Sequence, residues 1–306
     1  MRHAVALTLA AVLIAALARA GLAAGWQGPA VLGIGLLATA AAIAAMVRLS
    51  ASDTLAARIA TPALFGALLL WLWEMLVVGL HISQVLLPSP SAIAQAFTTH
   101  LPVLGADFRQ TVLRAVVPGY ILGCGAGFAV AIAIDRSPFL RRGLLPLGNL
   151  ASAMPIVGIA PIMVMWFGFG WQSKAAVVVL MTFFPMLVNT TAGLAEAGTQ
   201  ERDLMHSYAA GYGTTLRKLR LQAALPHIFT ALKLNSTLAL IGAVVAEFFG
   251  TPIVGMGFRI STEAARLNLG MVWAEITVAA LAGSASFGAI ALVERAVTFW
   301  HPSFRD

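Results

Sequence analysis

The chain has 306 residues, of which 60% are hydrophobic and only 10% are charged, whereas about a quarter of the residues in soluble proteins are charged. This composition excludes a soluble globular protein, because such a protein needs a charged surface to stay in solution. The net charge of +7 is interpreted through membrane topology and not through nucleic-acid binding, since no soluble basic domain is visible beside the apolar segments.

Apolar segments of membrane-spanning length follow one another along the chain. A bilayer core of about 30 Å needs roughly 20 apolar residues per helix. Eight segments qualify, near residues 4–20, 29–47, 62–80, 111–134, 144–167, 175–194, 234–250 and 272–294. The sequence therefore predicts an all-α membrane protein with about eight transmembrane helices. Residues 1–24 also fit a cleavable signal peptide, and this alternative stays open.

The basic residues are distributed unequally between the two sides of these spans. With the N-terminus inside, thirteen of the 19 Lys and Arg residues flank the cytoplasmic ends. The others flank the outer ends and are Arg19, Arg109, Arg114, Lys174, Arg259 and Arg266. Because cytoplasmic flanks carry the excess of Lys and Arg, both termini are predicted to lie in the cytoplasm.

The longest predicted cytoplasmic segment, residues 195–233, is too polar to be buried in lipid. It is predicted to form a pair of short helices at the membrane surface. Gly211 and Gly213 tolerate positive φ and suit a sharp turn. A Thr cap at Thr214 would then start the second helix, and Pro226 would open the next helix at its first position.

The spacing between Gly213 and the "AALP" of residues 223–226 resembles a loop of known transport proteins. In the membrane permeases of bacterial ATP-binding-cassette importers, this loop has the pattern E-A-A-x3-G-x9-I-x-L-P. The Glu of the family falls here on Ser207, its first Ala on Tyr208 and its Ile on an alanine.

Three longer strings carry the same resemblance. Residues 73–93 resemble the first core helix and P-S-P loop of permeases that import taurine, alkanesulfonates, nitrate and pyrimidine nutrients. Residues 154–194 are similar to the W-F-G-x-G and F-F-P-x-x-x-N-T segment of that subfamily, and "VVAEFFG" at 244–250 matches its acidic element. The resemblance covers about residues 62–300, so an added helical hairpin precedes it.

The resemblance implies one subunit of an importer in a bacterial cytoplasmic (inner) membrane. Residues 1–55 would form a transmembrane hairpin extension, and residues 56–306 would form the permease domain with a six-helix core. Its partners would be a second permease copy, two ATPase subunits, a substrate-binding protein and the lipid bilayer, with no nucleic acid. The chain has no G-x-x-x-x-G-K-[ST] phosphate loop. It is therefore expected to be no enzyme and to bind no cofactor, while ATP and Mg²⁺ bind the partner ATPase.

The polar insert would be the coupling helix that contacts the ATPase. Arg217, Lys218 and Arg220 are expected to pair with acidic groups or lipid phosphates at the rim; a basic loop that only contacts lipid is the alternative. The candidate coupling residues are Ser207, Tyr208, Ala209, Ala210, Gly211, Tyr212, Gly213, Thr214, Thr215, Leu216 and Arg217.

Ionisable groups inside apolar spans cost about 2–3 kcal/mol or more, so Glu74 and Glu247 need an explanation. Glu247 is a candidate for the substrate pathway or a gate, where Phe248 would stack on a planar substrate. The alternative for both acids is a helix–helix hydrogen bond or a hydrated helix end. The candidate pathway residues are Glu247, Phe248, Trp166, Asn189 and Glu74.

Other residues in the spans are interpreted structurally. Asn189 and Asn235 are expected to hydrogen-bond across helices, and Gly123 and Gly127 to allow close backbone approach. Cys124, the one cysteine, is interpreted as a small packing residue.

The outer loop and the histidines give no catalytic or metal site. In the loop of residues 250–268, Glu263 is expected to offset Arg259 and Arg266. The six histidines are scattered, and neither H-E-x-x-H nor G-x-S-x-G occurs. No catalytic residue and no metal ligand is therefore predicted.

Two other functions stay open beside the importer. A secondary transporter or channel would work without an ATPase, and an intramembrane lipid enzyme would need paired ionisable residues on facing helices. The substrate is predicted to be a planar heterocycle of the thiamine-precursor pyrimidine or riboflavin type, because no Lys or Arg falls deep within a span. A sulfonate- or nitrate-type anion stays open, since helix N-termini can hold anions.

Overall fold

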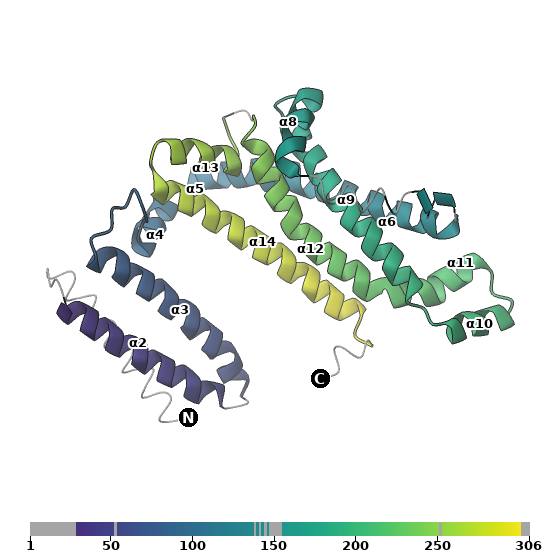
Figure 1. Cartoon of the computed structure of the whole chain (residues 1–306), viewed down its shortest axis with the longest axis horizontal. Coiled ribbons are helices and arrows are strands. Elements are labelled where there is room, and N and C mark those ends of the chain that lie inside the picture. Colours follow the sequence, from purple (N-terminus) through teal and green to yellow (C-terminus); the bar gives the residue numbers. More distant parts are fainter. Residues whose placement is uncertain are drawn as a thin grey trace. The chain divides into compact units, whose positions relative to one another are not determined.

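The computed structural model describes residues 29–51, 54–137, 139–140, 142–143, 146, 155–250 and 253–300 (Figure 1). Every regular element in these ranges is helical, which confirms the all-α prediction. The predicted span at 4–20, the signal-peptide alternative and the first part of the span at 144–167 lie outside the described residues.

The chain divides into two compact units. The first comprises the residues up to His100 with Glu263–Ala274, and the second comprises Leu101–Thr262 with the residues from Glu275. The first unit contains α2 (Pro29–Ser50), α3 (Leu55–Gly79) and α4 (Pro90–Thr99). The second unit contains α5 (Leu101–Phe108), η1 (Arg109–Val116), α6 (Val117–Arg136), α8 (Ile156–Phe167), α9 (Trp171–Ala195), α10 (Thr199–Ser207), α11 (Tyr212–Thr215), η2 (Leu216–Arg220) and α12 (Leu221–Glu247). The last two helices, α13 (Met256–Ala265) and α14 (Leu269–Val297), have residues in both units.

The described helices overlap the later seven predicted spans, although only the second half of the span at 144–167 is described and the helices at Leu101–Arg136 and Tyr212–Glu247 begin earlier than predicted. Five are long and apolar enough to cross a membrane, namely Ala57–Gly79, Leu101–Arg136, Trp171–Ala195, Tyr212–Glu247 and Leu269–Val297. Shorter apolar helices lie at Gly35–Ser50 and Ile156–Phe167. The total of eight spans and the division at residue 55 stay predictions.

In the second unit, α9 packs against both α6 and α12 (Figure 1). Glycines on α6 make the first contact close. A Cβ atom at Gly123 would lie 2.0 Å from Thr182 Oγ1, and one at Gly127 would lie 2.5 Å from the Phe183 carbonyl oxygen. These distances confirm the predicted packing role of both glycines. Gly119, one turn earlier, faces α9 in the same way.

Asparagine side chains in the second unit behave in two ways. Asn235 of α12 donates across helices to the Thr182 carbonyl (2.8 Å) and to Cys124 Sγ (3.2 Å), as predicted for Asn235. Asn189 instead donates to the Pro185 carbonyl of its own helix (2.8 Å), so the cross-helix prediction is wrong there. The i−4 carbonyl lies within reach of a short polar side chain in any helix and competes with a neighbouring helix.

In the first unit, α3 carries Glu74 against the start of α4. Its carboxylate accepts hydrogen bonds from the Ser91 amide (2.9 Å) and the Ser91 hydroxyl (2.6 Å). Ser91 lies in the first turn of α4, and Ser89 is the N-cap. A carboxylate at a helix N-terminus satisfies free N–H groups and complements the helix dipole.

We predict that replacing Gly123 by Leu destabilises the second unit, because the added side chain meets α9 at once. Overpacking of this kind costs about 1–3 kcal/mol or more. The apparent melting temperature of the purified protein in detergent should fall clearly. Gly125→Leu is the matched control, since nothing lies within 4 Å of a Cβ atom at Gly125. An equal effect of the two substitutions would contradict the packing of α6 on α9.

Candidate functional site

The predicted coupling segment is a helical hairpin whose turn lies earlier than expected. The helix α10 ends at Ser207, and Ala209 adopts a left-handed backbone conformation with φ of 53°. The Ala209 amide donates to the His206 carbonyl and the Ala210 amide to the Met205 carbonyl, which satisfies the helix end.

The predicted turn at Gly211 and Gly213 is therefore wrong. Gly211 has a φ of −69° and precedes α11 as its N-cap, and Gly213 lies inside that helix. The left-handed residue of this turn is Ala209, which precedes both glycines and is fixed by the hydrogen bonds at the end of α10.

One continuous helix runs from Tyr212 to Glu247 through α11, η2 and α12. The predicted Thr214 cap and the predicted helix start at Pro226 are both wrong, since both residues lie within this helix. The Gly211 carbonyl accepts from the amides at 214 and 215, so the helix is already established there. At 1.5 Å per residue the helix is roughly 50 Å long, which exceeds the bilayer core of about 30 Å.

Asp135, Arg220 and Tyr212 form the contact that we call the Asp135 clamp. The Arg220 guanidinium donates to both Asp135 carboxylate oxygens (2.6 Å each) and also to the Leu194 carbonyl. The Tyr212 hydroxyl donates to Asp135 Oδ2 (2.9 Å). Bidentate pairs of this kind are strong and fix geometry. The clamp joins the start of the long helix to the ends of α6 and α9.

This pairing corrects the predicted role of Arg220. Its guanidinium is engaged inside the subunit because Asp135, at the end of α6, lies within reach. Arg217 and Lys218 are exposed on the same segment, so they stay candidates for the rim.

Glu247 lies at the other end of the long helix in a buried polar cluster. Its side chain is 2% exposed. It accepts hydrogen bonds from the Thr111 hydroxyl (2.8 Å) and from the Gly257 amide (2.7 Å). The Thr111 oxygen in turn accepts from the Met256 amide (2.9 Å). A carboxylate and a hydroxyl from two different helices thus hold the first turn of α13.

Asp107 of α5 also binds the start of α13. It is fully buried, and it accepts from the Gly255 amide (2.6 Å) and from Arg259 Nε (2.8 Å). Three successive amides at 255–257 are therefore satisfied by side chains, as buried N–H groups require. Arg259 thus pairs with Asp107, a partner that the sequence did not predict, whereas Glu263 pairs with Arg266 as predicted (3.1 Å).

The glycines of this turn are required by geometry. Gly255 has a φ of 144°, a conformation that favours glycine, and a Cβ atom there would lie 2.7 Å from Glu247 Oε1. A Cβ atom at Gly257 would lie 2.1 Å from the Val244 carbonyl oxygen. The backbone thus comes close enough for its amides to reach the buried acids.

Lys174, in the first turn of α9, is a buried cation. From the sequence, it was predicted to flank the outer end of a span. It is 1% exposed. Its ammonium group donates to the carbonyls of Phe169 and Gly250, and it attracts Glu247 electrostatically. The sequence could not predict this burial, because a lysine at the end of an apolar segment is usually exposed at the membrane surface.

The other candidate pathway residues have different surroundings. Phe248 is exposed, and Trp166 is 71% exposed. Asn189 bonds within α9 and Glu74 caps α4, as described above, so the contacts of both are structural. Their role in a pathway stays a prediction.

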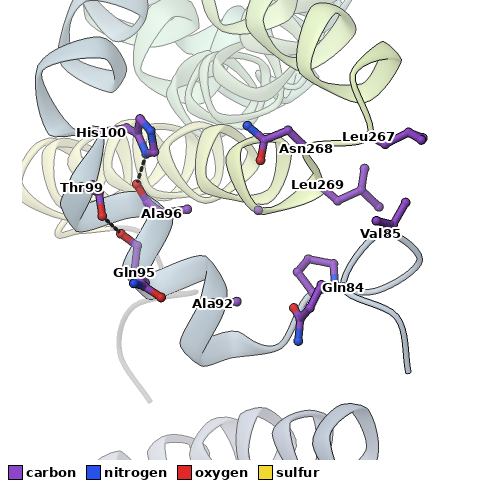
Figure 2. A pocket seen from close by; sticks show the side chains of 12 residues that line it. Gln84, Val85, Ala92, Gln95, Ala96, Thr99, His100, Leu267, Asn268 and Leu269 are labelled. Carbon is purple, nitrogen blue, oxygen red and sulfur yellow. Dashed lines mark hydrogen bonds between the residues drawn. The ribbon is translucent and has the colours of Figure 1, made fainter. Parts of the chain in front are cut away.

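A pocket of about 430 Å³ lies in the first unit between α4 and the start of α14 (Figure 2). Its polar groups include the amides of Gln84, Gln95 and Asn268, the Thr99 hydroxyl and the His100 ring. Figure 2 shows Gln95, Thr99 and His100 along one side and Leu269 with Val85 on the other. No carboxylate, ammonium or guanidinium lines it.

The chain matches the family described as "Binding-protein-dependent transport system inner membrane component" over residues 119–299. The chain belongs to this family. Its members are transport permeases and not enzymes, and the helices described above agree with an inner-membrane component that crosses the bilayer several times.

The sequences of individual relatives align with most of this permease. It is 31% identical to the "Probable ABC transporter permease protein" of Haemophilus influenzae over 72% of this chain and 89% of the relative. It is 31% identical to the "Formylaminopyrimidine transport permease protein ThiX" of Halalkalibacterium halodurans over 78% of this chain and 95% of the relative. It is 28% identical to the "Putative aliphatic sulfonates transport permease protein SsuC" of Bacillus subtilis over 79% of this chain and 87% of the relative.

We predict that Arg220→Lys loosens the hairpin of α10 and α11, because Lys cannot form the bidentate pair with Asp135. Limited proteolysis of the purified protein should cut near residues 208–211 several-fold faster, a change on the order of 1 kcal/mol in local stability. The control is Arg217→Lys, which changes an exposed cation on the same helical turn. Equal cleavage of both variants would argue against the clamp.

Proposed function

We propose that the chain is the permease subunit of an ATP-driven importer. Two copies form the translocation pathway, two separate ATPase subunits bind ATP and Mg²⁺, and a binding protein delivers the nutrient from outside. The subunit has about eight spans, a six-helix core with an N-terminal hairpin, and both termini in the cytoplasm, in line with the excess of Lys and Arg on that side.

The observation that carries this proposal is the exposed hairpin of α10 and α11 with its anchor. No residue of α10 is buried, and the exposed side chains include Leu204 and Tyr208, the latter at 77%. Exposed apolar and aromatic groups beside cations are typical of a protein-binding surface. A partner that moves this hairpin also moves α6 and α9, because the Asp135 clamp joins them.

Glu247 and its cluster support a role in the conformational cycle at the far end of the same helix. Motion of the hairpin reaches Glu247 through one continuous helix, and Glu247 holds the first turn of α13. We place α13 at the outer mouth of the pathway, where the predicted orientation puts residues 250–268. Trp166 and Phe248, both exposed, are among the side chains available there to a planar substrate or to a second copy.

For the substrate we propose a planar uncharged heterocycle of the pyrimidine or flavin type. A relative is named for formylaminopyrimidine transport, and another is named for aliphatic sulfonates. The buried cation Lys174 does not favour the anion, because two carbonyls and Glu247 already satisfy its charge. The uncharged pocket beside Gln95 agrees with a neutral molecule at that face.

A secondary transporter or channel is the second candidate, and it would leave the exposed hairpin without a partner. An intramembrane lipid enzyme would need paired ionisable residues on facing helices. Asp107 and Glu247 do lie on different helices of one cluster, but both are buried and hydrogen-bonded within the protein, so neither is open to a lipid substrate.

We predict that Tyr208→Arg on the hairpin weakens association with the ATPase subunit at least about tenfold, since central aromatic residues contribute about 2 kcal/mol or more to interfaces. The measurement is co-purification of the permease with the ATPase encoded beside it, followed by titration of the ATPase. Gln95→Arg, which lies in the first unit, is the control and should bind normally. Normal binding of the Tyr208→Arg variant would remove the hairpin as the ATPase contact.

A further inference from the structure

Glu275 of α14 is a fully buried acid that belongs to none of the contacts described above. It is 0% exposed. Among the described residues, no hydrogen-bond donor reaches either of its carboxylate oxygens. The side chain with which it interacts most strongly is Asp107, another carboxylate. Two acceptor groups therefore face each other in the interior.

Asp107 is the acceptor in this pair. It already accepts one hydrogen bond from the Gly255 amide and one from Arg259, and a charge-assisted bond to a guanidinium favours the carboxylate form. Each carboxylate oxygen has room for a second donor. A third hydrogen bond to Asp107 is thus chemically available, and Glu275 can supply it only if it carries a proton.

The charges of the cluster lead to the same conclusion. Asp107 and Glu247 are the two carboxylates with donors, and Lys174 and Arg259 are the two cations that face them. With Glu275 neutral, these four charges cancel. An ionised Glu275 would leave one buried negative charge without a donor, which is strongly unfavourable in an apolar interior.

We propose that Glu275 is a proton-binding site: its side chain is a neutral carboxylic acid whose O–H donates to Asp107. The bound proton fastens α14 to α5 and, through Asp107, to the first turn of α13. Glu275 is a positioning residue, since it acts by holding Asp107 in place for Gly255 and Arg259. The ligand is a single proton and not a metal ion, because the described residues contain no group of three side chains suited to a metal.

The experiment compares two buried glutamates of α14 by infrared spectroscopy and thermal unfolding of the purified protein. Glu294 is the matched control, because its carboxylate has a cationic partner, Lys233 (2.7 Å). At mildly alkaline pH the wild-type protein should show the carbonyl stretch of a protonated carboxylic acid, which shifts in D₂O. Glu275→Gln should remove this band, and Glu294→Gln should leave it unchanged.

The stability of the variants gives the second readout. Glu275→Gln should unfold at nearly the wild-type temperature, because the amide still donates to Asp107, while Glu275→Leu should unfold at a clearly lower one. A missing band in the wild type, a band that survives Glu275→Gln, or equal destabilisation by Gln and Leu would each overturn the proposal. These readouts need neither ATPase nor transport, so they stand apart from a failure of the proposed function.

Discussion

The long helix from Tyr212 to Glu247 is held by polar side chains at both ends, and the second unit depends on this constraint. Near its start, Arg220 forms a bidentate pair with Asp135, and at its end Glu247 accepts from Thr111. Both partners lie on the continuous helix Leu101–Arg136. Polar groups in an apolar surrounding stay bonded because an unpaired group costs several kcal/mol, so the two helices are tied together along their length.

Two π-helical segments coincide with these ties. Thr111 lies in η1 and Arg220 lies in η2, each near the start of its long helix. Insertions of this type occur often at functional sites because they shift the helical phase and re-aim side chains. In this permease, one π-helical segment carries Arg220, which binds Asp135, and the other carries Thr111, which binds Glu247. These two contacts connect the hairpin of α10 and α11 to α13.

The sequence predicted the apolar helices and the position of the polar insert. Both signals are local: the length of each apolar run, and the spacing between Gly213 and Pro226. The sequence also singled out Glu247, since an acid in an apolar run stands out. It could not supply the partners of Glu247, because Thr111 is 136 positions away. The sequence also did not predict the turn at Ala209. Alanine does not favour a left-handed backbone conformation, so this conformation depends on the surrounding hydrogen bonds and not on the residue type.

The central claim is that ATP hydrolysis in a separate subunit drives import through this chain. The most direct measurement is uptake of a radiolabelled pyrimidine into proteoliposomes that contain the permease, the co-purified ATPase and the binding protein, with and without ATP. We expect uptake that requires ATP and stops when the ATPase is omitted. Uptake by the permease alone, without ATP, would contradict it and would favour a secondary transporter or channel.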